Sequence, residues 1–194
     1  MEIYLIRHTT PLIHEGLCYG QTDIPVNASF PAEAEKVRLK CPPKIDRVYS
    51  SPLGRCLRLA YFLYPHQPVE SIHALKEMHF GDWENQPWDR IQASSLDAWM
   101  KDFVHRGVPG GESFFSLFQR STAWWERTVI SSYNTDPVAC ITHAGVIRSL
   151  LCHCTGTSLE NAFTAFPVPF GAVYRLRRLP DPGKEKDTWE SLLL

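Results

Sequence analysis

Three short segments with the pattern of strands, each followed at once by basic or hydroxyl-bearing residues, most constrain the fold of this chain. Ile3–Ile6 runs into Arg7 and His8, Asp46–Tyr49 into Ser50–Arg55, and Val138–Ile141 into Thr142–Gly145. Apolar runs of this length, bounded by turn-forming residues, predict buried strands. Ligands bind at the carboxyl ends of strands in an open α/β sheet. The sequence therefore predicts one site that gathers Arg7, Arg55, His8 and His143 at such an edge.

The segments between these runs carry apolar residues at helical spacing. Helices are expected from Pro31 to just before Pro42, from Ser51 to Tyr64, over 112–133 and over 146–154, with a late strand over 172–179. In the second helix, Ser51 is the expected N-cap and Pro52 the first helical residue. Its predicted apolar stripe, which leaves Arg55 outside, is Leu53, Cys56, Leu57, Ala60, Tyr61 and Tyr64. The tail after residue 180 is not assigned.

The alternation of strands and helices predicts the α/β class: a three-layer α/β/α sandwich with a mostly parallel central sheet. The 194 residues, 44% of them hydrophobic, suffice for one core, and no linker divides them. We therefore expect a single domain over residues 1–194.

Charge and apolar patterning exclude several classes of protein. A net charge of -1 argues against a nucleic-acid binder, and no apolar stretch is long enough to cross a membrane. The N-terminus lacks the pattern of a signal peptide, so we expect a cytoplasmic protein. The six cysteines have no C-x2-C spacing, which favours free thiols over a zinc site or disulfides.

Four segments in their order along the chain resemble the signature segments of the histidine phosphatase superfamily, which also holds the cofactor-dependent phosphoglycerate mutases. They are Arg7–Thr10, Ser50–Arg55, Leu75–Glu84 and Thr142–Val146. Within the superfamily, Cys18–Asp23, Phe80–Glu84 and Gly110–Ser113 are most similar to the α-ribazole phosphatase branch. The resemblance implies one histidine phosphatase domain that hydrolyses phosphomonoesters and needs no metal ion or other cofactor.

The resemblance assigns His8 as the nucleophile, which forms a phosphohistidine that water then hydrolyses. The second ring nitrogen of His8 needs an acceptor, such as a backbone carbonyl, to fix the tautomer. Arg7 and Arg55 are expected to hold the non-transferring oxygens, since guanidinium groups match phosphate geometry. His143 is expected to donate, as a cation, to the charge of the transition state.

Glu77 is assigned as the proton carrier, which protonates the leaving alkoxide and later takes a proton from water. Glu84 and Glu112 also lie in or beside the motif segments, and the residues alone leave the choice among the three open. Gly145 is expected to permit a tight turn after His143.

The sequence also suggests residues that line the substrate pocket: Thr9, Gln21, Thr22, His79, Trp83 and Ala144. Thr9 and Thr10 stand where many members have Gly-Glu, and His14 stands where many have Asn. Aromatic residues gather at Tyr19, Phe80, Trp83, Trp88, Trp99 and Phe103. Each of these either packs against a heteroaromatic leaving group or belongs to the core.

The most specific function that the resemblance implies is hydrolysis of α-ribazole 5′-phosphate to α-ribazole and phosphate, in cobalamin nucleotide-loop assembly. Alternatives are a phosphatase of another small phosphate ester, a phosphoglycerate mutase, and an inactive protein that binds phosphorylated ligands. The expected partner is a small-molecule phosphate ester. The oligomeric state stays open, with a homodimer among the options.

Overall fold

The computed structural model describes residues 1–130, 137–179 and 188–194. Within these residues one sheet has six strands in the order β3-β2-β4-β1-β5-β6. They are β1 (Glu2–Arg7), β2 (Arg47–Ser50), β3 (Val69–Ser71), β4 (Val138–Thr142), β5 (Val173–Leu179) and β6 (Thr188–Leu193). The first four are parallel, whereas β5 is antiparallel to both β1 and β6. The expected mostly parallel sheet is confirmed.

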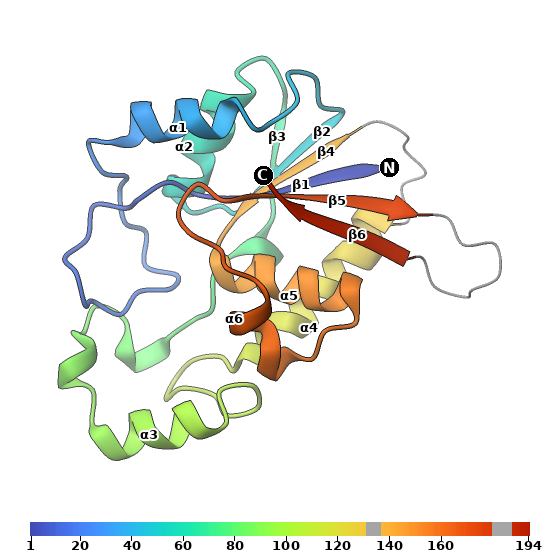
Figure 1. The fold of residues 1–194 in the computed structure, drawn as a ribbon. Coiled ribbons are helices and arrows are strands. Elements are labelled where there is room, and N and C mark those ends of the chain that lie inside the picture. Colours follow the sequence, from blue (N-terminus) through green and yellow to red (C-terminus); the bar gives the residue numbers. More distant parts are fainter. Residues whose placement is uncertain (131–136, 180–187) are drawn as a thin grey trace.

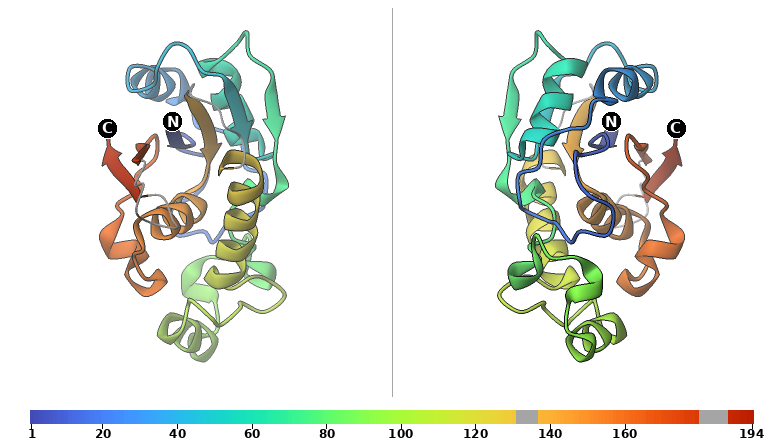
Figure 2. Two further views of the ribbon diagram at one scale, coloured as in Figure 1. Left: turned by 90° about the vertical axis from the view of Figure 1, so that its right-hand side faces the viewer. Right: turned by 90° about the vertical axis from the view of Figure 1, so that its left-hand side faces the viewer.

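Helices cover both faces of the sheet, as expected for a three-layer sandwich. The described helices are α1 (Phe30–Arg38), α2 (Gly54–Leu63), α3 (Ala93–Lys101), α4 (Phe114–Trp124), α5 (Ala144–Thr155) and α6 (Ala162–Ala165). Figures 1 and 2 show α1 and α2 on one face, α4 and α5 on the other, and α3 set apart from the sheet. None of the described helices is long and apolar enough to span a membrane.

The side chains of β1 show why the strand sequences are almost continuously apolar. Ile3 and Leu5 join the core cluster that contains α4 and α5, whereas Tyr4 and Ile6 join the cluster beneath α1 and α2. Successive side chains of a strand point to opposite faces, and here both faces are covered. The central strands are thus buried on both sides, and their carboxyl ends are fixed relative to one another.

The start of α2 differs from the sequence expectation. The helix begins at Gly54 with Leu53 at its N-cap position, so Ser51 is not the cap and Pro52 precedes the helix. The Gly54 N–H, which the helix itself leaves without a partner, donates to Asp23 Oδ1 at 2.8 Å. The N-cap thus lies two residues later than expected. The buried residues of the helix are Arg55, Cys56, Leu59, Ala60 and Leu63, so Arg55 is fully buried rather than outside the buried face.

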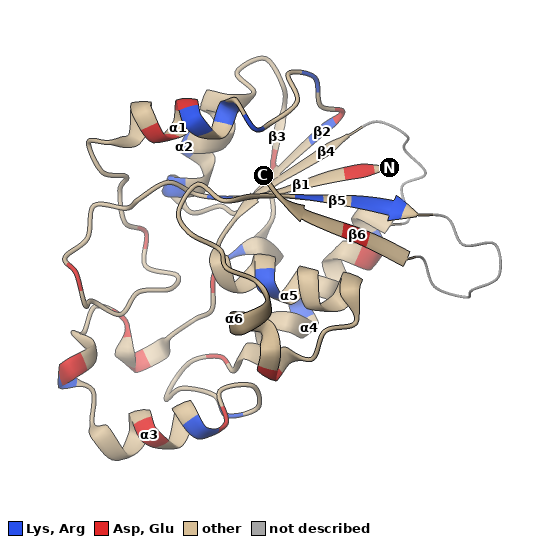
Figure 3. Ribbon diagram, in the orientation of Figure 1, with Lys and Arg blue, Asp and Glu red and all other residues tan. Residues whose placement is uncertain are grey.

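Other elements also differ from the boundaries expected from the sequence. The helix expected over 112–133 begins at Phe114, because Ser113 is its cap and accepts from Ser116 N–H at 3.1 Å, and its end at Tyr133 lies outside the described residues. The unassigned tail contains β6, an edge strand that pairs with β5. All six cysteines are free thiols. Basic and acidic residues are mixed on α1 and α3 (Figure 3), consistent with the small net charge.

Candidate active site

The site lies where β1, β2 and β4 end side by side. Arg7, the last residue of β1, is in register with Thr142, the last residue of β4. The backbone ladder continues one residue further, since the His8 N–H donates to the Thr142 carbonyl at 3.1 Å and the Ser51 N–H to the Ile141 carbonyl at 2.9 Å. The sheet therefore brings His8 and His143 together, as the sequence predicts, with ring centroids 5.1 Å apart.

The geometry around His8 selects one neutral tautomer. Its Nδ1 lies 2.7 Å from the Thr9 carbonyl, which only accepts hydrogen bonds, so the ring proton is assigned to Nδ1. The backbone acceptor expected from the sequence is therefore present. Burial, and then the charges of Arg55 and Arg7, lower the pKa of His8 well below the ordinary value. Nε2 consequently carries an unprotonated lone pair, as a nucleophile requires.

Arg55 enters from the first turn of α2 and contacts both histidines. Its Nε donates to His8 Nε2 at 3.3 Å, and its Nη2 lies 3.2 Å from His143 Nδ1. The carbonyls of Thr22 and Gly20 accept from Nη1 and Nη2 at 2.9 and 2.7 Å. These contacts hold the guanidinium group within the site, because Arg55 lies on the buried face of α2.

Arg7 lies on the other side of His8. Its Nη1 donates to the Val168 carbonyl at 2.6 Å, and its guanidinium stacks 3.8 Å from the Phe170 ring centroid. Its Nε is buried and has no hydrogen-bond partner among the described residues. A buried donor of this kind suits a phosphate oxygen, because leaving it unpaired is costly.

His143 departs from the expected cationic donor. Burial, and then the charge of Arg55, lower its pKa well below the ordinary value, so the ring is neutral in the unliganded site. Because Nδ1 faces a donor of Arg55, the ring proton is assigned to Nε2, which donates to Ser51 Oγ at 2.8 Å. His143 is fully buried and packs edge-on against His8 rather than lining the cavity.

The structure separates the three candidate proton carriers. Glu77 faces the cavity, and its carboxylate accepts from the N–H groups of Met78 at 3.0 Å and Gly145 at 3.2 Å. The Glu84 carboxylate is engaged by the loop at Gln21 and Thr22. Burial alone would raise the pKa of Glu84, but hydrogen bonds from Thr22 and from backbone N–H groups lower it overall. Glu112 is ion-paired with Arg120 at 2.7 Å. Of the three, only Glu77 can reach a ligand.

Gly145 is needed for a different reason from the one expected. Its backbone φ is not positive, so no tight turn requires glycine there. Instead, a Cβ atom at this position would lie 2.3 Å from Glu77 Oε1. The missing side chain thus makes room for the carboxylate against the first turn of α5.

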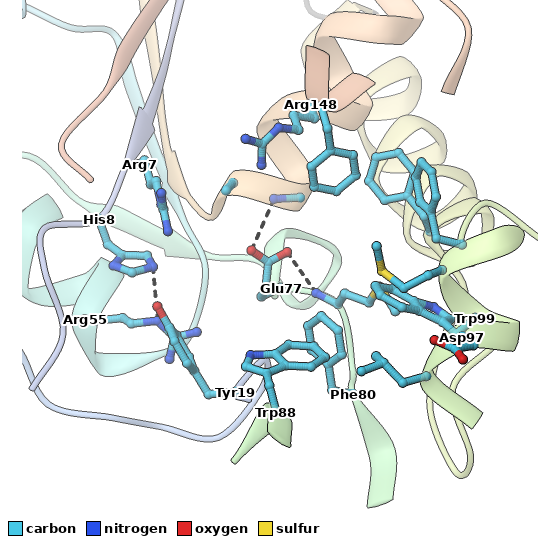
Figure 4. Close-up of a pocket in the computed structure, with 18 residues that line it drawn as sticks. Arg7, His8, Tyr19, Arg55, Glu77, Phe80, Trp88, Asp97, Trp99 and Arg148 are labelled. Carbon is cyan, nitrogen blue, oxygen red and sulfur yellow. Dashed lines mark hydrogen bonds between the residues drawn. The ribbon is translucent and has the colours of Figure 1, made fainter. Parts of the chain in front are cut away.

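These groups open into a cavity of about 580 Å³ (Figure 4). Arg7, His8, Arg55 and Glu77 form one end, and mainly aromatic and apolar residues from α3 to α6 and the connecting loops form the rest, together with the charged residues Asp97 and Arg148. Trp88 and Trp99 are stacked, with centroids 6.4 Å apart, and Phe80 meets both edge-on. The arrangement combines anion-binding groups with an apolar wall of matching size for a small organic ligand.

The family is settled by a match to the model of the histidine phosphatase superfamily (branch 1), which covers residues 3–189. The chain belongs to this superfamily. It is 30% identical over 168 residues to the adenosylcobalamin/alpha-ribazole phosphatase of Escherichia coli (strain K12), covering 82% of both proteins. It is also 29% identical over 168 residues to the metal-independent phosphoserine phosphatase of Arabidopsis thaliana, covering 81% of this chain and 70% of that one.

Solved structures agree with the family. The alpha-ribazole phosphatase from Shigella flexneri superposes with a TM-score of 0.85 at 26% identity, over 99% of this chain and 96% of that one. The names of these relatives all denote phosphatases, although for different phosphate esters. This chain is therefore a phosphatase of the histidine phosphatase superfamily.

Most residues that the sequence suggested for the substrate pocket of this histidine phosphatase do not line the cavity. Of the six, only Ala144 lines the cavity. Thr9 is fully buried, Gln21 and Thr22 bind Glu84 through their backbone N–H groups, and the His79 backbone bonds to Glu112. Trp83 is core: it packs behind the wall, against the rings of Trp88 and Trp99.

The aromatic residues that the sequence left open between pocket wall and core divide: Tyr19, Phe80, Trp88, Trp99 and Phe103 line the cavity. Arg148 was missed. Its Nε donates to the Phe166 carbonyl at 3.1 Å, its guanidinium lies 4.5 Å from the Phe163 ring centroid, and it faces the cavity near Glu77 (Figure 4). The signal was present, since Arg148 follows Ala144 by four residues and so lies on the same face of the helix.

Proposed function

We propose that this histidine phosphatase hydrolyses α-ribazole 5′-phosphate to α-ribazole and phosphate, through a phosphohistidine on His8 and without a metal ion. The observation that carries the proposal is one cavity with a neutral His8 and two guanidinium groups at one end and aromatic rings at the other. A phosphorylated heteroaromatic nucleoside has the same division between an anionic and a planar apolar part. The name of the Escherichia coli relative supports this substrate and hence cobalamin nucleotide-loop assembly.

In the first step, the His8 Nε2 lone pair attacks phosphorus as the ester P–O bond breaks. The substrate has to displace Arg55 Nε from this lone pair, because the lone pair cannot accept a hydrogen bond and attack at once. Arg7 and Arg55 then hold the non-transferring oxygens, supplying the charge that a metal ion supplies in other phosphatases. Glu77 gives its proton to the leaving alkoxide and becomes a carboxylate.

In the second step, a water molecule attacks the phosphorus of phosphohistidine while the Glu77 carboxylate takes one of its protons. The P–N bond breaks and its electron pair returns to Nε2, which regenerates neutral His8 and protonated Glu77. The Nδ1–H bond to the Thr9 carbonyl persists throughout and stabilises the positive charge of the phosphorylated ring.

His143 contributes in two stages. In the unliganded site it orients Arg55 through Nδ1. A bound phosphoryl dianion offsets the arginine charges that, after burial, lower the pKa of His143. Once Arg55 turns from His143 Nδ1 to the phosphoryl oxygens, proton uptake at this nitrogen becomes favourable, and the ring acts as a donor to the phosphoryl group.

The test is phosphate release in EDTA from α-ribazole 5′-phosphate, phosphoserine, 3-phosphoglycerate, sugar phosphates and nucleotides, with His8→Ala beside the wild type. Release from α-ribazole 5′-phosphate that is at least tenfold faster than from the others, and lost in His8→Ala, is the expected result. Isomerisation of 3-phosphoglycerate without net phosphate release points to a mutase. Ligand binding without turnover points to an inactive binding protein.

A second candidate is a phosphate ester that also carries a carboxylate, such as phosphoserine. Arg148 is the observation that favours it, because a third guanidinium faces the cavity beside Arg7 and Arg55. Because Glu77 and Asp97 line the same cavity, the guanidinium donors of Arg148, which suit a carboxylate, favour this candidate rather than the total charge. With phosphoserine as substrate, Arg148→Gln raises KM about tenfold or more, whereas with α-ribazole 5′-phosphate KM changes less than about threefold.

A further inference from the structure

The segment that carries Glu77 has no regular secondary structure of its own. It follows the turn at His73–Leu75, and residues 76–80 form neither helix nor strand. Proton transfer nevertheless requires a carboxyl group held within hydrogen-bond distance of the reacting oxygen. Something outside the segment must therefore fix its backbone.

Arg120, on α4, makes that contact with three of its five N–H donors. Its Nη1 donates to the carbonyls of Ala74 and Lys76, both at 2.8 Å, and its Nη2 donates to the Glu77 carbonyl at 2.9 Å. The remaining two N–H groups, on Nε and Nη2, reach Glu112 at 2.7 and 2.9 Å. An arginine has five N–H donors, and all five are engaged here.

Glu112 lies two residues before the start of α4 and contacts the other end of the same segment. We refer to Arg120 and Glu112 together as the clamp. Its Oε2 accepts from the His79 N–H at 2.9 Å, and its own N–H donates to the His79 carbonyl at 2.8 Å. The pair Arg120–Glu112 thus grips the backbone on both sides of Glu77, from Ala74 to His79. Neither residue lines the cavity, so neither can touch a substrate there.

We propose that Arg120 and Glu112 are positioning residues for the proton carrier, and that they set how well this enzyme expels poor leaving groups. The inference rests on the proposed function, because it assumes that Glu77 protonates the leaving alkoxide. A displacement of about 1 Å in a catalytic group can cost about a hundredfold in rate. Loosening the clamp therefore lowers the rate for esters that need a proton and spares esters that do not.

The test compares two esters under single-turnover conditions, with enzyme in excess, so that only the first step is measured. 2-Phenylethyl phosphate leaves as an alkoxide that needs a proton, whereas p-nitrophenyl phosphate leaves as a stabilised phenolate. Arg120→Gln and Glu112→Gln are expected to slow the alkyl ester about tenfold to a hundredfold and the p-nitrophenyl ester less than about threefold. Glu77→Gln serves as the reference for complete loss of the proton carrier.

Arg127→Gln is the matched control, since the exposed Arg127 lies further along the same helical run and its Nε donates to the Ala123 carbonyl. It should leave both rates unchanged. Glu112→Gln keeps the shape of the side chain and carries the test if Arg120→Gln does not fold. Equal losses on the two esters, or no loss on either, overturn the proposal.

The outcome for Glu77→Gln separates this inference from the proposed function. If Glu77→Gln slows the alkyl ester selectively while the clamp variants do not, the function stands and the clamp is wrong. If Glu77→Gln shows no difference between the esters, Glu77 is not the proton carrier and this inference fails, whereas phosphate release from α-ribazole 5′-phosphate that is lost in His8→Ala still supports the proposed function.

Discussion

Replacing Gly145 by alanine should impair catalysis while leaving stability nearly intact. The added Cβ would lie 2.3 Å from Glu77 Oε1, whereas ordinary van der Waals contact begins at 3.4 Å, so the carboxylate has to move by about 1 Å. A shift of this size in a catalytic group costs about a hundredfold in rate. We therefore expect about that loss in the single-turnover rate for 2-phenylethyl phosphate.

The stability of Gly145→Ala follows from two opposing effects. Alanine in a helix is more stable than glycine by about 0.5–1 kcal/mol. The weakened bond from the Gly145 N–H to Glu77, at 3.2 Å, costs about 1 kcal/mol. The free energy of unfolding should thus stay within about 1 kcal/mol of the wild-type value.

Urea denaturation and the single-turnover assay together check this prediction. Gly107→Ala is the control, because its Cβ would meet nothing closer than 3.6 Å and its φ is not positive. An active Gly145→Ala enzyme would refute the argument that Glu77 needs this space. A large loss of stability would show instead that the glycine serves the fold.

Three further predictions concern pH, the aromatic wall and a buried hydroxyl. Folding keeps His8 and His143 neutral while the unfolded chain binds a proton on each below about pH 6.5, so the free energy of unfolding, measured in urea, should fall below that pH by about 1.4 kcal/mol per unit for each ring, and these two rings should add no slope between about pH 7 and 8. His143→Gln should weaken the acid slope, and an unchanged slope contradicts the assignment. Trp88→Ala should raise KM for α-ribazole 5′-phosphate about fivefold without changing inhibition by inorganic phosphate, whereas weaker phosphate inhibition would mean a disturbed His8 end. Thr9→Val should keep kcat/KM and stabilise the fold by up to about 1 kcal/mol in thermal denaturation, because the Thr9 hydroxyl is buried without a partner among the described residues. A tenfold loss of kcat/KM would mean that the Thr9 hydroxyl binds phosphate.

The central part of the site could be predicted because it depends on strands that are buried on both faces. Ile3–Ile6 and Val138–Ile141 are apolar at every position, and no other place in a domain of this size accommodates such runs. Parallel pairing then places the residues after each strand at one edge. His8 and His143 therefore meet as a direct consequence of local sequence.

The pocket could not be predicted in the same way. Trp83 and Trp88 look alike in the sequence, yet one is core and the other lines the cavity. Gln21 and Thr22 belong to a motif segment, but their backbone binds Glu84 rather than a ligand. Such outcomes depend on how loops of irregular structure pack against one another, and periodicity carries no information about that.

By itself, the sequence predicted the order of the strands and helices that were recognised, and the edge of the sheet at which Arg7, His8, Arg55 and His143 gather. The tertiary structure alone decided which glutamate faces the cavity, the neutral state of His143, and the presence of Arg148 there. The physical reason is that buried strands and helices follow from local apolar patterns. Proton states and cavity walls instead depend on burial and charges contributed by residues far apart in the chain.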